Sequence, residues 1–141
     1  METKGGCPRG GCLCNAVRYE LSSDPIVHIA CHCRTCQYVG GGAPTLAALY
    51  PKSAVSITQG AVKTYWSKSD SGVNVGRSFC AAFGTPLFAG PEENPQFVAI
   101  KVGSLDDPSA FKVQLDIWRS TAQPWHTHYD DAKQFDKNPS R

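Results

Sequence analysis

The sequence predicts a mainly β protein, and three observations support that prediction. Short segments in which apolar and polar residues alternate recur along the 141 residues, which is the pattern of half-buried strands. The chain contains 13 glycines and 10 prolines, which interrupt long helices. No segment shows a sustained apolar period of 3.6 residues, so amphipathic helices are not indicated.

The first predicted strand lies within residues 15–21, where Val17, Tyr19 and Leu21 share one face and Arg18 and Glu20 the other. Short apolar segments bounded by Gly, Pro, Ser or Asp predict the remaining strands at 27–30, 45–50, 54–58, 62–66, 73–79, 87–89, 97–102 and 112–118. One short helical turn is predicted at 34–38. The chain length suits one domain covering residues 1–141, with its core at about 8–130 and loose ends at 1–10 and 131–141.

Charge and hydropathy exclude several classes of protein. The formal net charge is +2 and no basic run occurs, so we do not expect a nucleic-acid partner. The apolar runs are far shorter than the roughly 20 residues of a membrane-spanning helix. The first residues lack the apolar core of a secretory signal, which predicts a cytoplasmic protein in which cysteines bind metal rather than form disulfides. The sequence does not indicate the oligomeric state, and a homo-oligomer is compatible with it.

Three of the seven cysteines, Cys31, Cys33 and Cys36, lie within six residues. This spacing allows one turn of backbone to direct three sulfurs at a single ion, and thiolates are the ligands that zinc prefers. Three protein ligands leave the fourth coordination position open, which is typical of a catalytic zinc unless a distant residue closes it.

Histidines are the candidates for that distant ligand. His32 lies inside the cysteine segment, where ligation is less expected than a solvated or hydrogen-bonded imidazole. His28 is a further candidate. His126 and His128 share a strand-like spacing but are expected to be ordinary surface residues.

A second group consists of Cys12 and Cys14, with Cys80 at the end of a later strand. A close pair with one distant cysteine suggests a structural zinc site. The alternative is that these small side chains fill core positions without a metal.

Several motifs in order along the chain resemble the glutathione-dependent formaldehyde-activating enzyme family, whose domain is shared with centromere protein V. The resemblance rests on Gly10-Gly11-Cys12-Leu13-Cys14, Cys31-His32-Cys33-Arg34-Thr35-Cys36, Arg77-Ser78-Phe79-Cys80, Gly103-Ser104-Leu105-Asp106-Asp107-Pro108, Asp116-Ile117-Trp118 and Pro124-Trp125. It implies a β-tent (Mss-four-like) fold of packed antiparallel sheets with zinc knuckles. It also implies a catalytic zinc held by Cys31, Cys33 and Cys36 and a structural zinc held by four cysteines.

The sequence departs from the family at the structural zinc. Cys12, Cys14 and Cys80 match three of its ligands, but Phe83 stands where the resemblance implies the fourth. The second zinc has therefore lost a ligand, recruits another, or is absent. Cys7 is the candidate recruit, because a short glycine-containing segment joins it to Cys12. If the site holds no metal, Phe83 fills the vacated space with apolar contacts.

The resemblance further implies glutathione as the partner thiol and carbon–sulfur lyase chemistry, in which zinc holds the thiolate that adds to, or leaves from, an electrophilic carbon such as an aldehyde. Arg34, beside the cysteines, is the candidate to position a glutathione carboxylate; the alternative is a solvated charge. Two other functions remain open. Either the domain acts on a specialised metabolite, as suggested by Phe83 and by Asp116, where the resemblance implies histidine, or it is a non-catalytic, zinc-stabilised binding module.

Overall fold

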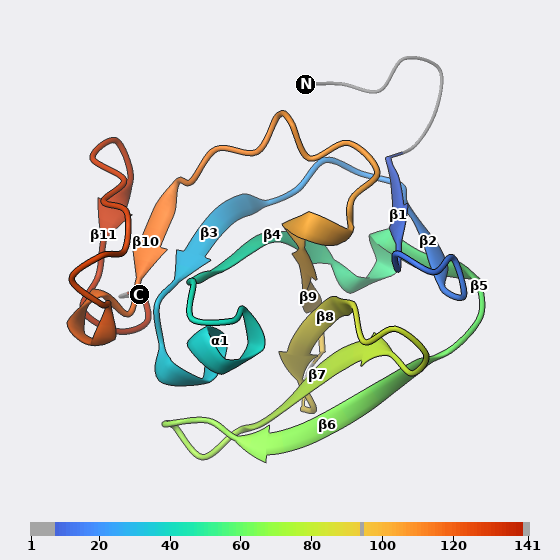
Figure 1. Cartoon of the computed structure of the whole chain (residues 1–141), viewed down its shortest axis with the longest axis horizontal. Coiled ribbons are helices and arrows are strands. Elements are labelled where there is room, and N and C mark those ends of the chain that lie inside the picture. The colour runs from blue at the N-terminus through green and yellow to red at the C-terminus, as the bar shows by residue number, and fades with distance from the viewer. Residues whose placement is uncertain (1–7, 94, 140–141) are drawn as a thin grey trace.

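The computed structural model of the protein describes residues 8–93 and 95–139. In that part of the chain, strands dominate (Figure 1). The strands are β1 (Arg9–Gly11), β2 (Arg18–Leu21), β3 (Val27–Cys31), β4 (Thr45–Pro51), β5 (Val55–Gln59), β6 (Val62–Lys68), β7 (Asn74–Cys80), β8 (Pro86–Pro91), β9 (Phe97–Lys101), β10 (Leu115–Ile117) and β11 (Lys133–Gln134). The helical elements are α1 (Arg34–Val39) and the short 3-10 helices η1 (Lys52–Ala54), η2 (Val102–Ser104) and η3 (Arg119–Thr121). The prediction of a mainly β protein with one short helix after Cys33 is confirmed.

The strands form two sheets. The smaller has the order β1-β2-β5, and the larger has the order β11-β10-β3-β4-β9-β8-β7-β6. Neighbouring strands are antiparallel except β10, which pairs in parallel with both β3 and β11. Before β10, the chain crosses from β9 in the middle of the large sheet to the far side of β3, and residues 118–132 then return it so that β11 runs parallel to β10 (Figure 1). The prediction of antiparallel sheets therefore holds except at this edge.

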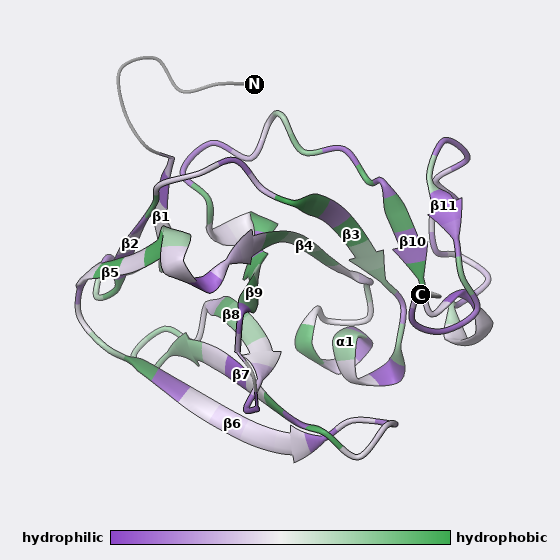
Figure 2. Ribbon diagram, turned by 180° about the vertical axis from the view of Figure 1, so that it is seen from behind, coloured by the Kyte–Doolittle hydropathy of each residue, from purple (hydrophilic) through white to green (hydrophobic). Residues whose placement is uncertain are grey.

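The main core lies where one face of the large sheet meets the small sheet. The period-2 pattern of β2 places Tyr19 and Leu21 there with no exposed surface, whereas Arg18 and Glu20 are half-buried on the other face, as predicted. Apolar side chains of the central strands complete the cluster, among them Ala48, Tyr50, Leu87, Phe88 and Ile100. Hydrophobic residues concentrate on β3, β4, β8 and β9, and β6 and β11 are more hydrophilic (Figure 2).

Both ends of the described chain are better fixed than the sequence predicts. Residues 131–141 are predicted to be loose, but β11 pairs with β10, and the amide of Phe135 donates to the carbonyl of Asp116 at 3.0 Å. At the other end, β1 begins at Arg9, inside the segment that is predicted to be loose, and pairs with β2. Gly10 permits this pairing, because a Cβ atom there would lie 2.3 Å from the Tyr19 hydroxyl oxygen. No helix in the described residues is long and apolar enough to cross a membrane.

Because of Tyr19, the stability of this core should decrease at alkaline pH. Its hydroxyl lies 2.6 Å from Ser104 Oγ, which itself donates to the carbonyl of Lys101, so Tyr19 is the donor. Burial raises the pKa of Tyr19 to about 12, from the ordinary value of 10. The unfolded chain therefore loses this proton above pH 10 while the folded chain retains it.

We expect the free energy of unfolding to fall between pH 10 and 12. Tyr19 contributes its full stabilisation below pH 10, and about 2 to 3 kcal/mol is lost as pH rises to the folded-state pKa. Urea denaturation at a series of pH values measures this loss. Tyr19→Phe should show a shallower slope over the same range, and an equal slope in both proteins would contradict the assignment.

Candidate metal centres

The first cysteine cluster lies where β3 ends and α1 begins. Cys31 is the last residue of β3, Cys33 caps α1, and Cys36 lies in the first turn of that helix. The three Sγ atoms lie within 4.8 Å of one another. The amide of Cys36 donates to Cys33 Sγ at 3.3 Å, so this sulfur also satisfies a free amide at the helix start. The structure thus brings together the three cysteines predicted as zinc ligands.

The backbone of this turn is held by buried polar contacts. Gln37, which is 2% exposed, donates its side-chain amide to the carbonyl oxygens of His32 at 2.7 Å and Thr121 at 3.0 Å. The Thr121 hydroxyl also donates to the His32 carbonyl, at 3.0 Å. The amide of His32 donates to the carbonyl of Ile117 on β10. The peptide between the first two cysteines is therefore fixed from both sides.

The chemistry of the three sulfurs fits a zinc ion. The neighbouring sulfurs of Cys33 and Cys36, together with burial, raise the pKa of Cys31, and the sulfurs of Cys31 and Cys33 lower the pKa of Cys36. Three such crowded thiols lose their protons together only when a cation balances their charge, and thiolate is the form that zinc binds. Cys36 is buried, whereas Cys31 and Cys33 are partly exposed, so the cluster can be reached from solvent.

The second cluster joins β7 to the loop after β1. Cys12 Sγ and Cys14 Sγ are 3.4 Å apart, and Cys14 Sγ and Cys80 Sγ are 3.5 Å apart. Backbone amides donate to the outer sulfurs, Val17 to Cys12 at 3.2 Å and Phe83 to Cys80 at 3.4 Å. The backbone amides of Phe83 and Ala82 lower the pKa of Cys80 to about 6. Cys7, the predicted recruit, lies outside the described residues. All six described cysteines are free thiols.

The structure corrects the prediction that Phe83 fills the space of a missing ligand. The Phe83 side chain is 60% exposed and lies outside the core, although its amide still contacts Cys80 Sγ. The turn that starts at Cys80 therefore keeps amides directed at sulfur, as in a metal-binding knuckle.

We expect Phe83→Cys to strengthen zinc binding at this cluster at least about tenfold, because it adds a thiolate to a turn that is already shaped for one. Removing an exposed phenyl ring should cost little stability. Competition with a zinc chelator measures the affinity, and Phe83→Ser is the matched control that adds no ligand of comparable strength. Unchanged affinity in Phe83→Cys would indicate that another residue already occupies the fourth position. Cys7→Ser then identifies that residue, because a lowered zinc stoichiometry would assign the position to Cys7.

Sequence reasoning missed a buried polar network behind the first cluster. His32 Nε2 lies 2.6 Å from Asp116 Oδ1, and His32 Nδ1 lies 2.8 Å from His126 Nδ1. His32 and Asp116 have no exposed surface and His126 is 6% exposed, so the prediction that His126 is a surface residue is wrong. His128 is exposed, as predicted, and contacts Arg119. Within the described residues, no histidine belongs to a group of ligand atoms that could hold a metal.

The partners of His126 fix the direction of these hydrogen bonds. The amide of Gln123 donates to His126 Nδ1 at 3.3 Å, and His126 Nε2 faces the carbonyl of Gly42 at 2.9 Å. His126 is therefore the Nε2–H tautomer, and His32 Nδ1 donates to it. His32 Nε2 also lies 3.1 Å from Arg119 Nη1, so this nitrogen faces both a carboxylate and a guanidinium. Burial lowers the pKa of His32, and the hydrogen bond to Asp116 opposes that effect.

Arg34 lies on the outer surface of α1. Its guanidinium donates to the side chain of Gln37 and lies 5.0 Å from the centre of the Tyr38 ring. Arg34 is exposed. Its predicted role in positioning a carboxylate stays a prediction.

Comparison with known proteins agrees with the cysteine pattern. The family model described as "Glutathione-dependent formaldehyde-activating enzyme" matches residues 7–121. A crystal structure of a Rhodobacter sphaeroides protein from structural genomics has a TM-score of 0.56 at 22% identity, over 70% of this chain and 87% of that chain, and thus shares the fold. A comparison with curated proteins found no match. The chain belongs to the glutathione-dependent formaldehyde-activating enzyme family.

Proposed function

We propose that the protein is a zinc-dependent carbon–sulfur lyase. It binds glutathione or a related small thiol at the cluster of Cys31, Cys33 and Cys36, and it forms or breaks the bond between that sulfur and an electrophilic carbon such as an aldehyde. The observation that carries the proposal is the convergence of three sulfurs within 4.8 Å, two of them partly exposed. Membership in the family supports glutathione as the thiol.

The chain's own residues hold and orient the reacting centre. Zinc, when bound by the three cysteines, supplies a Lewis acid that favours the thiolate form of the substrate at neutral pH. Cys31 and Cys33 leave one side of the cluster accessible, and the contacts of Gln37 and Thr121 with the His32 carbonyl fix the turn that carries them. A fixed turn reduces the reorganisation needed when the thiol enters.

The reaction balances without a redox partner. In the direction of synthesis, the sulfur–carbon bond forms, the π bond of the carbonyl breaks, and the thiol proton is transferred to the carbonyl oxygen. In the reverse direction, the proton leaves that oxygen, the carbonyl re-forms, and the sulfur leaves as a thiolate. The open side of the cluster is where the carbonyl compound approaches.

The direct test is glutathione binding to the full chain loaded with cobalt in place of zinc. We expect glutathione to change the absorption bands of the cobalt–thiolate centre, and S-methylglutathione, which has no free thiol, to leave them unchanged. Exchange spectroscopy by nuclear magnetic resonance then measures interconversion of formaldehyde and its glutathione adduct, which also occurs without a catalyst. An exchange rate equal to the uncatalysed rate, or an unchanged cobalt spectrum with glutathione, would refute the proposal.

A further inference from the structure

The large sheet presents two chemically different faces. Cross-strand partners share a face, and residues two apart on a strand do as well. The pairs Arg77 with Ala89, Ala89 with Ala99, and Lys101 with Ala47 therefore lie on one face, opposite the core face. Helix α1 covers part of this same face, because the hydroxyl of Thr45, two residues before Ala47, donates to the carbonyl of Cys36.

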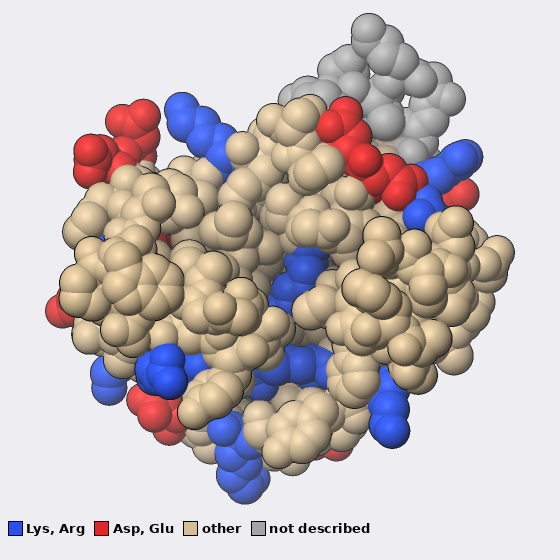
Figure 3. Space-filling model, viewed as in Figure 1, with Lys and Arg blue, Asp and Glu red and all other residues tan. Residues whose placement is uncertain are grey.

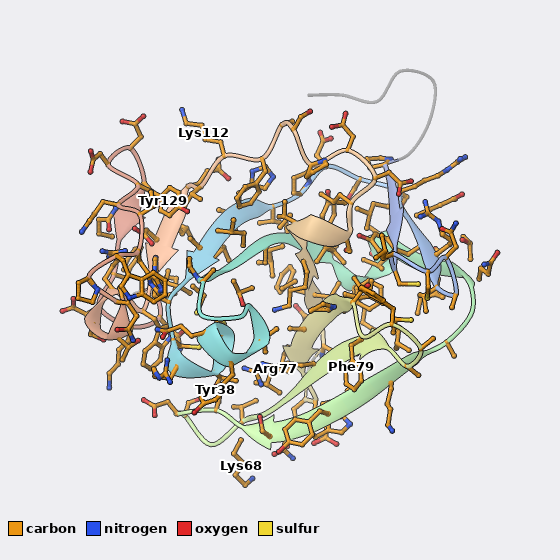
Figure 4. The ribbon with its side chains drawn as sticks, viewed as in Figure 1. Tyr38, Lys68, Arg77, Phe79, Lys112 and Tyr129 are labelled. Carbon is orange, nitrogen blue, oxygen red and sulfur yellow. The ribbon has the colours of Figure 1, made fainter. Side chains whose placement is uncertain are left out.

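This face is hollowed where the side chains are small. Figure 3 shows a hollow between α1 and strands β7 to β9, with Lys and Arg side chains inside it and Asp and Glu at the periphery of the view. Arg77 lies in the space between β7 and α1 (Figure 4). We call the residues Arg77, Ala89, Ala99 and Lys101 the cationic cleft. Its floor consists of two alanines and its charges come from β7 and β9.

One cation of the cleft is buried and the other is half-buried, and neither has an acidic partner among the described residues. Lys101 is 8% exposed, and Arg77 is half-buried with one hydrogen bond, to Ser67 Oγ at 3.1 Å. Neither forms an ion pair with any acidic residue of segments 8–93 and 95–139. Burial lowers the pKa of Lys101; the neighbouring Cys36 opposes this shift, and the positive charge of Arg77 adds to it. Two like charges held together in a cleft make a site that a negatively charged group stabilises.

The cleft adjoins the first cysteine cluster. Cys31 pairs with Thr45 on β4, and Lys101 pairs with Ala47, two residues further along the same strand and on the same face. A thiol substrate whose sulfur enters the cluster would therefore extend the rest of its structure over the cleft. Arg34, exposed and in contact with Gln37 and Tyr38, is placed less well for this role.

We infer that the cationic cleft binds a carboxylate of the thiol substrate, with Arg77 and Lys101 as the residues that select carboxylate-bearing thiols over neutral ones. This inference rests on the proposed function, because it assumes that the substrate sulfur enters the cysteine cluster. The planar guanidinium of Arg77 suits two-point contact with a carboxylate. Lys101 supplies a second charge from the side of the cysteines.

The test compares glutathione with its diethyl ester, which keeps the thiol and masks both carboxylates. Calorimetry on the zinc-loaded full chain should show that glutathione binds about ten- to a hundredfold more tightly than the ester, the range expected for a charge-assisted contact. Arg77→Gln and Lys101→Met should each reduce glutathione affinity and leave the affinity for the ester within about twofold. Arg77→Lys and Lys101→Arg should restore part of the preference. Lys133→Gln, on the opposite edge of the sheet, is the control for loss of one positive charge.

The outcomes separate the cleft from the proposed function. Equal affinity of the wild type for glutathione and ester would overturn the inference and leave thiol binding in place. Loss of zinc in Lys101→Met, with an unchanged preference in Arg77→Gln, would also overturn it, because Lys101 would then only balance the charge of the cysteine thiolates. If neither thiol binds, the proposed function fails. Binding of S-methylglutathione then tests whether the cationic cleft binds a carboxylate. If S-methylglutathione binds to the wild type and not to Arg77→Gln, the inferred carboxylate site is supported. If it does not bind to the wild type, the inference is overturned.

Discussion

Replacing Cys33 by serine should remove one zinc ion per chain and abolish glutathione binding. Cys33 supplies one of the three sulfurs of the first cluster, and losing one thiolate should weaken zinc binding on the order of 100-fold or more. Serine is suited to this position for a separate reason. Its hydroxyl can accept from the amide of Cys36 as the Cys33 sulfur does, so the cap of α1 is retained.

The design separates the two roles of this sulfur. Cys33→Ala loses both the ligand and the cap, and it should be about 1 kcal/mol less stable than Cys33→Ser when both are measured without metal. Zinc content by elemental analysis and urea denaturation report the two effects. Cys14→Ser, in the second cluster, is the control that should leave glutathione binding intact. If Cys33→Ser keeps its full zinc content and binds glutathione, the cluster is not the thiol site.

Replacing Asp116 by alanine should lower the free energy of unfolding by about 3 to 5 kcal/mol, the range for breaking a buried charged pair. Asp116 has no exposed surface, and its Oδ1 is 2.6 Å from His32 Nε2. Its Oδ2 lies 3.6 Å from Arg119 Nη1 and has no hydrogen-bond partner among the described residues. Alanine would leave His32 without its hydrogen-bond partner and the guanidinium of Arg119 without the negative charge that balances it.

Urea denaturation in saturating zinc measures this loss while the cysteine clusters are kept filled. Asp116→Asn, which keeps an oxygen that faces His32, should lose clearly less stability than Asp116→Ala. Asp130→Ala, at an exposed position, is the control and should change stability by less than about 0.5 kcal/mol. A loss below about 1 kcal/mol in Asp116→Ala would show that the network contributes little to folding.

The features that local sequence determines were predictable. The alternation in β2 specifies which side chains are buried, and Tyr19 and Leu21 are fully buried. The cluster at Cys31 was predictable because its three ligands fall within one turn of chain. The grouping of Cys80 with Cys12 and Cys14 was suggested by a close pair with one distant cysteine, and the resemblance to the family supported it. Strands β1 and β11 were missed, since Gly10-Gly11 and Lys133-Gln134 carry no apolar pattern.

The polar network could not be predicted, because its members meet only through tertiary structure. His32 contacts Asp116 and His126 across 84 and 94 residues of sequence. Each alone resembles an ordinary polar residue, and His126 follows a loop segment that suggests exposure. The burial of Asp116 follows from the parallel pairing of β10 with β3, which is itself the departure from the predicted antiparallel arrangement.

The two faces of the large sheet separate the residues that form the folding core from the residues that we infer to select the substrate. On β9, Ile100 belongs to the core while its neighbours Ala99 and Lys101 face the cleft, and on β8 Phe88 and Ala89 are divided in the same way. Adjacent residues on these strands are therefore subject to different constraints, core packing for one and ligand binding for the next. Variation at the cleft positions can change the size and charge of the accepted molecule while the folding core stays the same, so one scaffold can serve a series of substrates through changes at alternate residues.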